Sequence, residues 1–123
     1  MTNWEASGKT SFDVRDDDTE WDGDNAEDQI FDWAGGDDDF DPQKAQQCFF
    51  AYDADEPQNE TSYKLPFCYI EDGSPVAIKN GIYAVAQVLE GARGGVDLPD
   101  SVIADVRDKV EKYYNKLGED VPW

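Results

Sequence analysis

Two short apolar runs around a turn, at residues 65–78, constrain the fold of this chain more than any other feature. They read LPFCYI and PVAI, and the EDGS between them contains Asp72 and Gly73, a pair typical of a two-residue turn. This pattern predicts a β-hairpin. Apolar residues elsewhere in the chain recur at helical spacing, so the hairpin is predicted to pack against helices.

Four helices are predicted around the hairpin from their caps and apolar spacing. Asp24 is placed to cap the first, and Asp41 followed by Pro42 is typical of the start of the second. Gly94 and Gly118 are placed to end the third and fourth. The predicted helices cover about 25–34, then residues from 42 with Ala45, Cys48, Phe49 and Tyr52 on one stripe, then about 79–93, and finally from Asp100 to Leu117.

Length and hydropathy indicate how these elements are organised. A chain of 123 residues has room for one hydrophobic core. The predicted fold is α+β, with about four helices around a small β-hairpin in a single compact domain over 21–123. Residues 1–20 lack sustained apolar periodicity and are predicted to form a mobile acidic arm, in which Trp4 and Phe12 are candidate anchors for a partner.

The net charge of −19 sets the expected environment and excludes some partners. Twenty aspartates and nine glutamates face only ten lysines and arginines, and such a surface repels nucleic acid. In molar salt the distance over which exposed charges interact falls to about 3 Å, so this repulsion is suppressed. An Asp-rich, Lys-poor surface is typical of proteins from halophiles. The alternative is an acidic mimic of DNA, which would stay folded in dilute buffer and bind a DNA-binding protein.

The residue types present exclude several kinds of chemistry. There is no histidine, which removes Ser-His and Cys-His nucleophile pairs and most zinc sites. The acidic runs are interpreted as solvated surface, so we expect no enzyme, no cofactor and no metal. Cys48 and Cys68 are expected to be reduced and buried, and no secretory signal or membrane-spanning stretch is visible.

The stretch LEGARGGVDLP at residues 89–99 contains one of only three arginines. It lacks the lysine and serine or threonine of a phosphate loop and lies at a helix end, so its glycines are interpreted as a helix stop. For Arg93 we expect a structural ion pair, with Asp97 or with Asp53 and Asp55 as the carboxylate. Contact with a partner is the alternative.

Several short motifs together resemble a small uncharacterised module that is common in tailed-virus genomes. They are WDGD, YDAD, SYKLP and GARGGVD, and the resemblance extends from about Glu20 to Leu117. The module stands alone or is fused to head proteins, including the head maturation protease. Where the module usually carries lysine and arginine, this chain is acidic or neutral, which fits a virus of a halophilic archaeon.

The resemblance implies a non-enzymatic virion protein that binds the major capsid protein, as a decoration or minor head protein. Tyr63 and Lys64 of SYKLP then join Trp4 and Phe12 as candidate partner-binding residues. The alternative is an adaptor for head maturation and its protease; a metal-dependent enzyme built on aspartates ranks lower. The expected location is the virion head or the host cytoplasm, without nucleic acid or membrane partners and with a homo-oligomer on the capsid as one arrangement.

Overall fold

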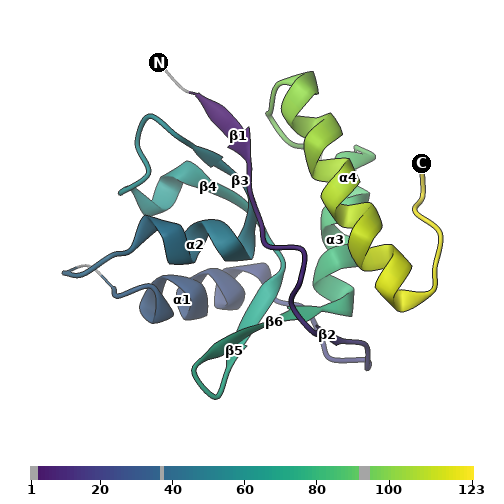
Figure 1. The fold of residues 1–123 in the computed structure, drawn as a ribbon, viewed down its shortest axis with the longest axis horizontal. Helices are drawn as coiled ribbons and strands as arrows, with labels where there is room; N and C mark the ends of the chain where they lie inside the picture. Colours follow the sequence, from purple (N-terminus) through teal and green to yellow (C-terminus); the bar gives the residue numbers. More distant parts are fainter. Residues whose placement is uncertain (1–2, 37, 92–94) are drawn as a thin grey trace.

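The computed structural model describes residues 3–36, 38–91 and 95–123, which form a single α+β domain with four α-helices and two small three-stranded sheets (Figure 1). One sheet has the order β1-β3-β4 and is antiparallel throughout. The other has the order β2-β6-β5, in which β2 is parallel to β6 and β5 is antiparallel to it. The strands are β1 (Trp4–Ala6), β2 (Val14–Arg15), β3 (Phe49–Asp53), β4 (Tyr63–Pro66), β5 (Cys68–Glu71) and β6 (Ser74–Ile78); the helices are α1 (Gly23–Trp33), α2 (Pro42–Cys48), the 3-10 turn η1 (Glu60–Ser62), α3 (Lys79–Leu89) and α4 (Asp100–Leu117).

The predicted hairpin is confirmed as strands β5 and β6, but Leu65 and Pro66 of its predicted first run belong to β4 in the other sheet. Asp72 and Gly73 join them with φ angles of 52° and 77°, the left-handed values that a two-residue turn requires. The hairpin is only part of a sheet, however, because β2 pairs with the outer edge of β6.

The helices follow the predicted order with three corrections. Asp22, and not Asp24, caps α1: its side chain accepts from the backbone N–H groups of Asp24 and Asn25. Helix α2 begins at Pro42 after the Asp41 cap as predicted, but it ends at Cys48. Helix α3 ends at Leu89, where Gly91 adopts a φ of 101°; Gly94, the predicted stop, lies outside the described residues.

The stripe predicted to continue α2 is strand β3, for a physical reason. Phe49, Phe50 and Ala51 are all fully buried in succession, which a helix on a domain surface cannot achieve. The ring of Phe49 stacks on Phe31 of α1, whereas Phe50 contacts Tyr113 of α4. The strand therefore lies between two helical layers and is buried on both faces.

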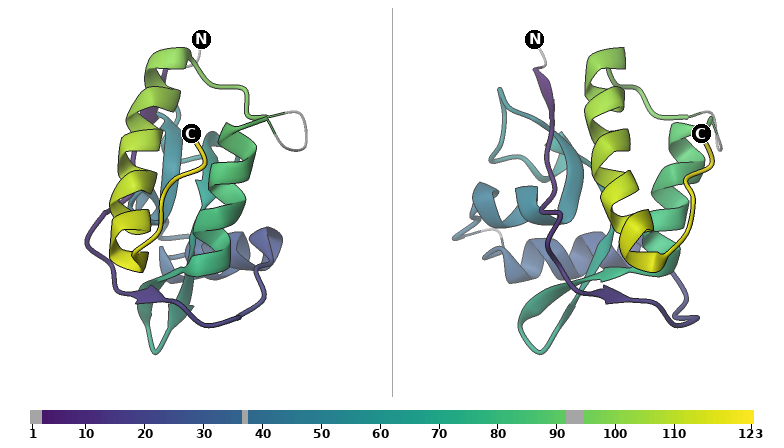
Figure 2. Two further views of the ribbon diagram at one scale, coloured as in Figure 1. Left: turned by 90° about the vertical axis from the view of Figure 1, so that its right-hand side faces the viewer. Right: turned by 45° about the vertical axis from the view of Figure 1, so that its right-hand side comes forward.

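The N-terminal residues, predicted to be a mobile arm, form strands of both sheets. Trp4–Ala6 pairs with β3, and Val14–Arg15 pairs with β6. Between these strands the chain runs along α4, as Figure 2 shows from two further sides. Side chains on one face of α4 donate hydrogen bonds to backbone carbonyls of this N-terminal segment: Lys109 to Gly8, Tyr113 to Lys9, and Lys116 to Thr10 and Phe12.

Candidate partner-binding site

Three of the residues singled out in the sequence lie together at one end of the β1-β3-β4 sheet. The Lys64 ammonium lies 4.6 Å from the centre of the Trp4 ring and donates to the backbone oxygen of Asp97 at 3.0 Å. Trp4 and Lys64 are both half-buried. Strand β1, strand β4 and the segment before α4 are thereby joined through one cation, and Asp97 takes part with its carbonyl and not its carboxylate.

Asp53 has a structural role at the same end of the sheet. Its side chain is 3% exposed and accepts hydrogen bonds from the backbone N–H groups of Asn3, at 2.9 Å, and Asp55, at 3.0 Å. A buried carboxylate needs such donors to offset the loss of water. Arg93 lies outside the described residues, so its predicted ion pair with Asp97, Asp53 or Asp55 stays a prediction.

Tyr63 and Phe12 are packed against the core. Tyr63 is 5% exposed, its hydroxyl donates to the carbonyl of Pro57 at 2.7 Å, and burial raises its pKa to about 12. Phe12 is half-buried, with its ring 6.3 Å from that of Phe67. Both rings therefore contribute to packing. Of the four candidates only Tyr63 is buried, and Trp4, Phe12 and Lys64 keep some exposed surface.

A second feature, which the motifs alone did not predict, is a cleft with a largely apolar lining. We call it the Trp21 cleft; it has a volume of about 170 Å³ and lies between the segment before α1, strand β4 and helix α3. Two of the motifs quoted above line it, because Trp21 and Gly23 belong to WDGD and Leu65 and Pro66 to SYKLP. Its remaining wall is formed by Ala84, Val85 and Val88 of α3.

Trp21 is held in the cleft wall by contacts on both sides. Its ring lies 5.0 Å from that of Tyr69, and the Tyr69 hydroxyl accepts from the Asp22 N–H and donates to the Glu20 carbonyl. On the other side it packs directly on Gly81 of α3, where a Cβ atom would lie only 2.9 Å from the indole. A glycine is needed there because the two elements approach so closely.

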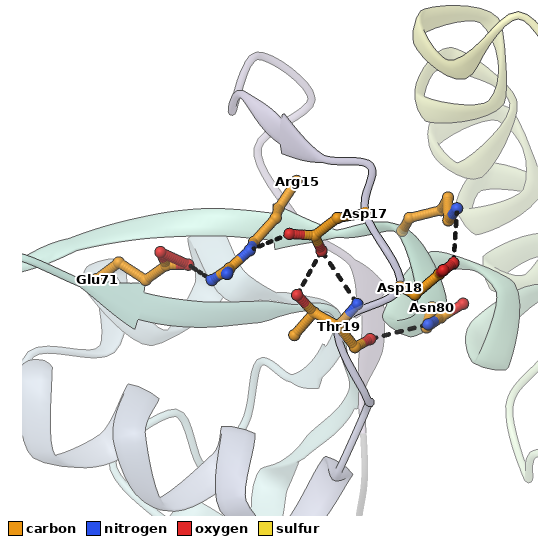
Figure 3. A network of polar contacts seen from close by, with 7 residues as sticks. Arg15, Asp17, Asp18, Thr19, Glu71 and Asn80 are labelled. Carbon is orange, nitrogen blue, oxygen red and sulfur yellow. Dashed lines mark hydrogen bonds and ion pairs between the residues drawn. The ribbon is translucent and has the colours of Figure 1, made fainter.

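A polar network fixes the chain just before Trp21 (Figure 3). Arg15 pairs with Glu71 of the hairpin at 2.8 Å and with Asp17 at 2.9 Å, and Asp17 also accepts from the backbone and hydroxyl of Thr19. Hydrogen bonds from Thr19 and Arg15 lower the pKa of Asp17 to about 2. Asn80 of α3 in turn donates to the carbonyl of Thr19 at 2.8 Å, so the network joins the hairpin, this segment and α3.

Backbone strain is found at Leu65 in the opposite wall of the cleft. Its φ of 65° is unusual for a branched side chain and costs about 1–3 kcal/mol. The neighbouring ladder pairs, Lys64 with Ala51 and Pro66 with Phe49, hold the strand on either side of it. WDGD and SYKLP could have suggested that these residues belong together, but only the fold shows that they form one cleft.

The described residues contain no group of three or more His, Cys, Asp or Glu side chains arranged to hold a metal ion. None of the helices in these ranges is long and apolar enough to cross a membrane. Comparisons of the chain with protein-family models, with curated proteins and with solved structures find no match.

Proposed function

We propose that the chain is a non-enzymatic virion protein of a halophilic tailed virus, bound to the major capsid protein as a decoration or minor head protein. The resemblance described above supplies the viral context. The observation that carries the binding role is the Trp21 cleft, an exposed apolar hollow in a strongly acidic chain, lined by residues of two motifs of that resemblance. A partly exposed apolar hollow of this size offers a place for one apolar anchor of a partner protein.

The distribution of cations supports a high-salt environment. Against twenty-nine acidic residues, the described residues form only three ion pairs, made by Arg15 and Lys79. Most other cations lie over aromatic rings or donate to backbone carbonyls, as Lys64 and Lys116 do. Most basic side chains thus contact rings and carbonyls of the fold, and most carboxylates have no basic partner among the described residues.

The proposal is tested on purified virus particles. We expect mass spectrometry to detect the chain in mature particles at a copy number that matches the capsomers, and imaging to place its density on the head. Absence from all particles would contradict the proposal, and presence in immature heads alone would favour the maturation adaptor. Deletion of residues 1–20 is not a suitable probe of binding, because it removes strands β1 and β2.

A further inference from the structure

We infer that the Trp21 cleft binds one apolar side chain of a partner protein, from a segment in which basic residues flank that side chain. This inference deepens the proposed function and rests on it for the partner's place in the virus head. It is carried by the size of the cleft, its lining, the strain at its wall and the charges around it.

The size and lining of the cleft select the kind of group that fits. A volume of about 170 Å³ is smaller than the roughly 300–1,000 Å³ of sites for small molecules and cofactors. It suits a single aliphatic or aromatic side chain, the usual anchor at the centre of a protein interface. Trp21, Pro66, Ala84 and Val88 are half-buried, so part of their apolar surface faces water until such an anchor covers it.

The strained backbone lies in the wall of this cleft. Leu65 is 8% exposed and lines the hollow with its φ in the left-handed region, although a glycine would adopt that conformation without cost. Strain of this kind persists where the surrounding structure holds it, and it clusters at ligand sites. Here it places a leucine side chain in the cleft wall, where a glycine would leave the wall incomplete.

The charged residues directly next to the cleft lining in sequence are mostly acidic. Glu20, Asp22 and Asp24 alternate with the lining residues Trp21 and Gly23, and all three are exposed.

Another exposed acid, Glu90, follows the lining residue Val88 by two positions. The base nearest in sequence to a lining residue is Lys64, and its ammonium already contacts the Trp4 ring and the Asp97 carbonyl. A partner segment with lysine or arginine on either side of its apolar anchor would complement this rim. A second copy of this chain, itself at −19, would not supply this complementarity.

The first test uses synthetic peptides on the folded chain in 3 M KCl. The probe is acetyl-Lys-Lys-Leu-Lys-Lys-amide, and binding is followed by NMR through the indole N–H signal of Trp21, assigned with Trp21→Phe. We expect this signal to shift on titration, and a peptide with serine in place of leucine to bind about tenfold or more weakly. Failure of the leucine peptide to move the Trp21 signal, or equal shifts with the serine peptide, would overturn the inference.

The charge requirement has its own test. Glutamates in place of the four lysines of the probe should weaken binding about threefold to tenfold at the lowest KCl concentration that keeps the chain folded, and the difference should narrow at 3 M KCl. Equal affinities of the lysine and glutamate peptides at both salt concentrations would contradict the proposed basic residues beside the anchor.

A matched pair of variants separates this inference from the proposed function. Ala84→Glu places a charge in the cleft wall, whereas Ala104→Glu places the same charge on an exposed position of α4. We expect only Ala84→Glu to abolish the peptide shifts and to lower the copy number in particles, and Val88→Ser serves as the second cleft variant if Ala84→Glu does not fold. Normal copy number for both cleft variants would overturn the inference while leaving the proposed function intact. Peptide binding by a chain that is absent from particles would overturn the proposed function while leaving the binding role of the cleft intact.

Discussion

The ammonium of Lys116 near the end of α4 donates to the carbonyl oxygens of Thr10, at 2.7 Å, and Phe12, at 3.1 Å. Lys109 and Tyr113 lie on the same face of the helix and donate to Gly8 and Lys9. Four hydrogen bonds thus tie the N-terminal segment to a helix about a hundred residues away. Because the acceptors are backbone carbonyls, these four hydrogen bonds do not depend on the side chains of the segment itself.

Replacing Lys116 with alanine should therefore destabilise the whole domain. Two hydrogen bonds from a charged donor are lost at an exposed site, and we expect the free energy of unfolding to fall by about 1 kcal/mol. Lys112→Ala is the matched control, because Lys112 is exposed on the same helix and makes no hydrogen bond or ion pair within the described ranges. Denaturant unfolding of both variants in 3 M KCl gives the comparison, and equal losses would contradict a specific role for Lys116.

The helices and the hairpin could be predicted because their signals are local. Asp41 with Pro42, Asp72 with Gly73, and Gly118 act within a few residues of their own positions. The short strands could not be predicted, since β1 and β2 span three and two residues and no periodicity develops over such lengths. Their pairing depends on β3 and β6, which are distant in sequence.

The site was predictable only in part, for the same reason. Trp4 and Lys64 were singled out as residues that contact a partner, whereas the structure shows first that they contact one another. Tyr63 belongs to the same motif as Lys64, but alternation along β4 places its ring in the core. The Trp21 cleft requires three segments to meet, and this depends on Gly81 allowing α3 to approach Trp21.

The contact between Gly81 and Trp21 predicts an unusual response to alanine. Glycine to alanine inside a helix ordinarily stabilises it by about 1 kcal/mol, but a Cβ at position 81 would lie 2.9 Å from the indole. We expect Gly81→Ala to displace Trp21, lower the free energy of unfolding by about 1–2 kcal/mol and change the near-ultraviolet circular dichroism. Gly23→Ala is the control, since its nearest neighbour is 3.8 Å away; a stable Gly81→Ala with an unchanged spectrum would contradict the contact.

The pair of Lys64 and Trp4 predicts a measurable coupling. In a double-mutant cycle with Lys64→Met and Trp4→Leu, we expect a coupling free energy of about 0.5–1 kcal/mol, as for other cation–aromatic contacts at partly exposed sites. The cycle is measured by denaturant unfolding. Additive effects of the two substitutions would show that the contact contributes nothing to stability.

The buried hydroxyl of Tyr63 predicts a loss of stability in alkali. Burial raises its pKa from 10 to about 12, so the folded state favours the protonated phenol. Its contribution is complete below pH 10, falls as the unfolded chain begins to ionise, and is lost as the pH rises through about 12. Between pH 9 and 11.5 we expect Tyr63→Phe to lose less stability than the wild type in urea unfolding; parallel losses in the two proteins would assign the alkaline effect to other tyrosines.

The two buried cysteines provide a direct test of the dependence on salt. Cys48 and Cys68 are both fully buried, and burial raises the pKa of the Cys68 thiol well above its usual value, which makes it unreactive. In 3 M KCl at pH 8 we expect a chromogenic disulfide reagent to modify neither thiol over minutes, with both reacting in guanidinium as the reference. Dilution to 0.1 M KCl restores the repulsion among the carboxylates, so both thiols should then react rapidly while the helical circular dichroism is lost. Thiols that stay protected in 0.1 M KCl would show that the domain tolerates its charge without screening, which is the behaviour expected of an acidic mimic of DNA.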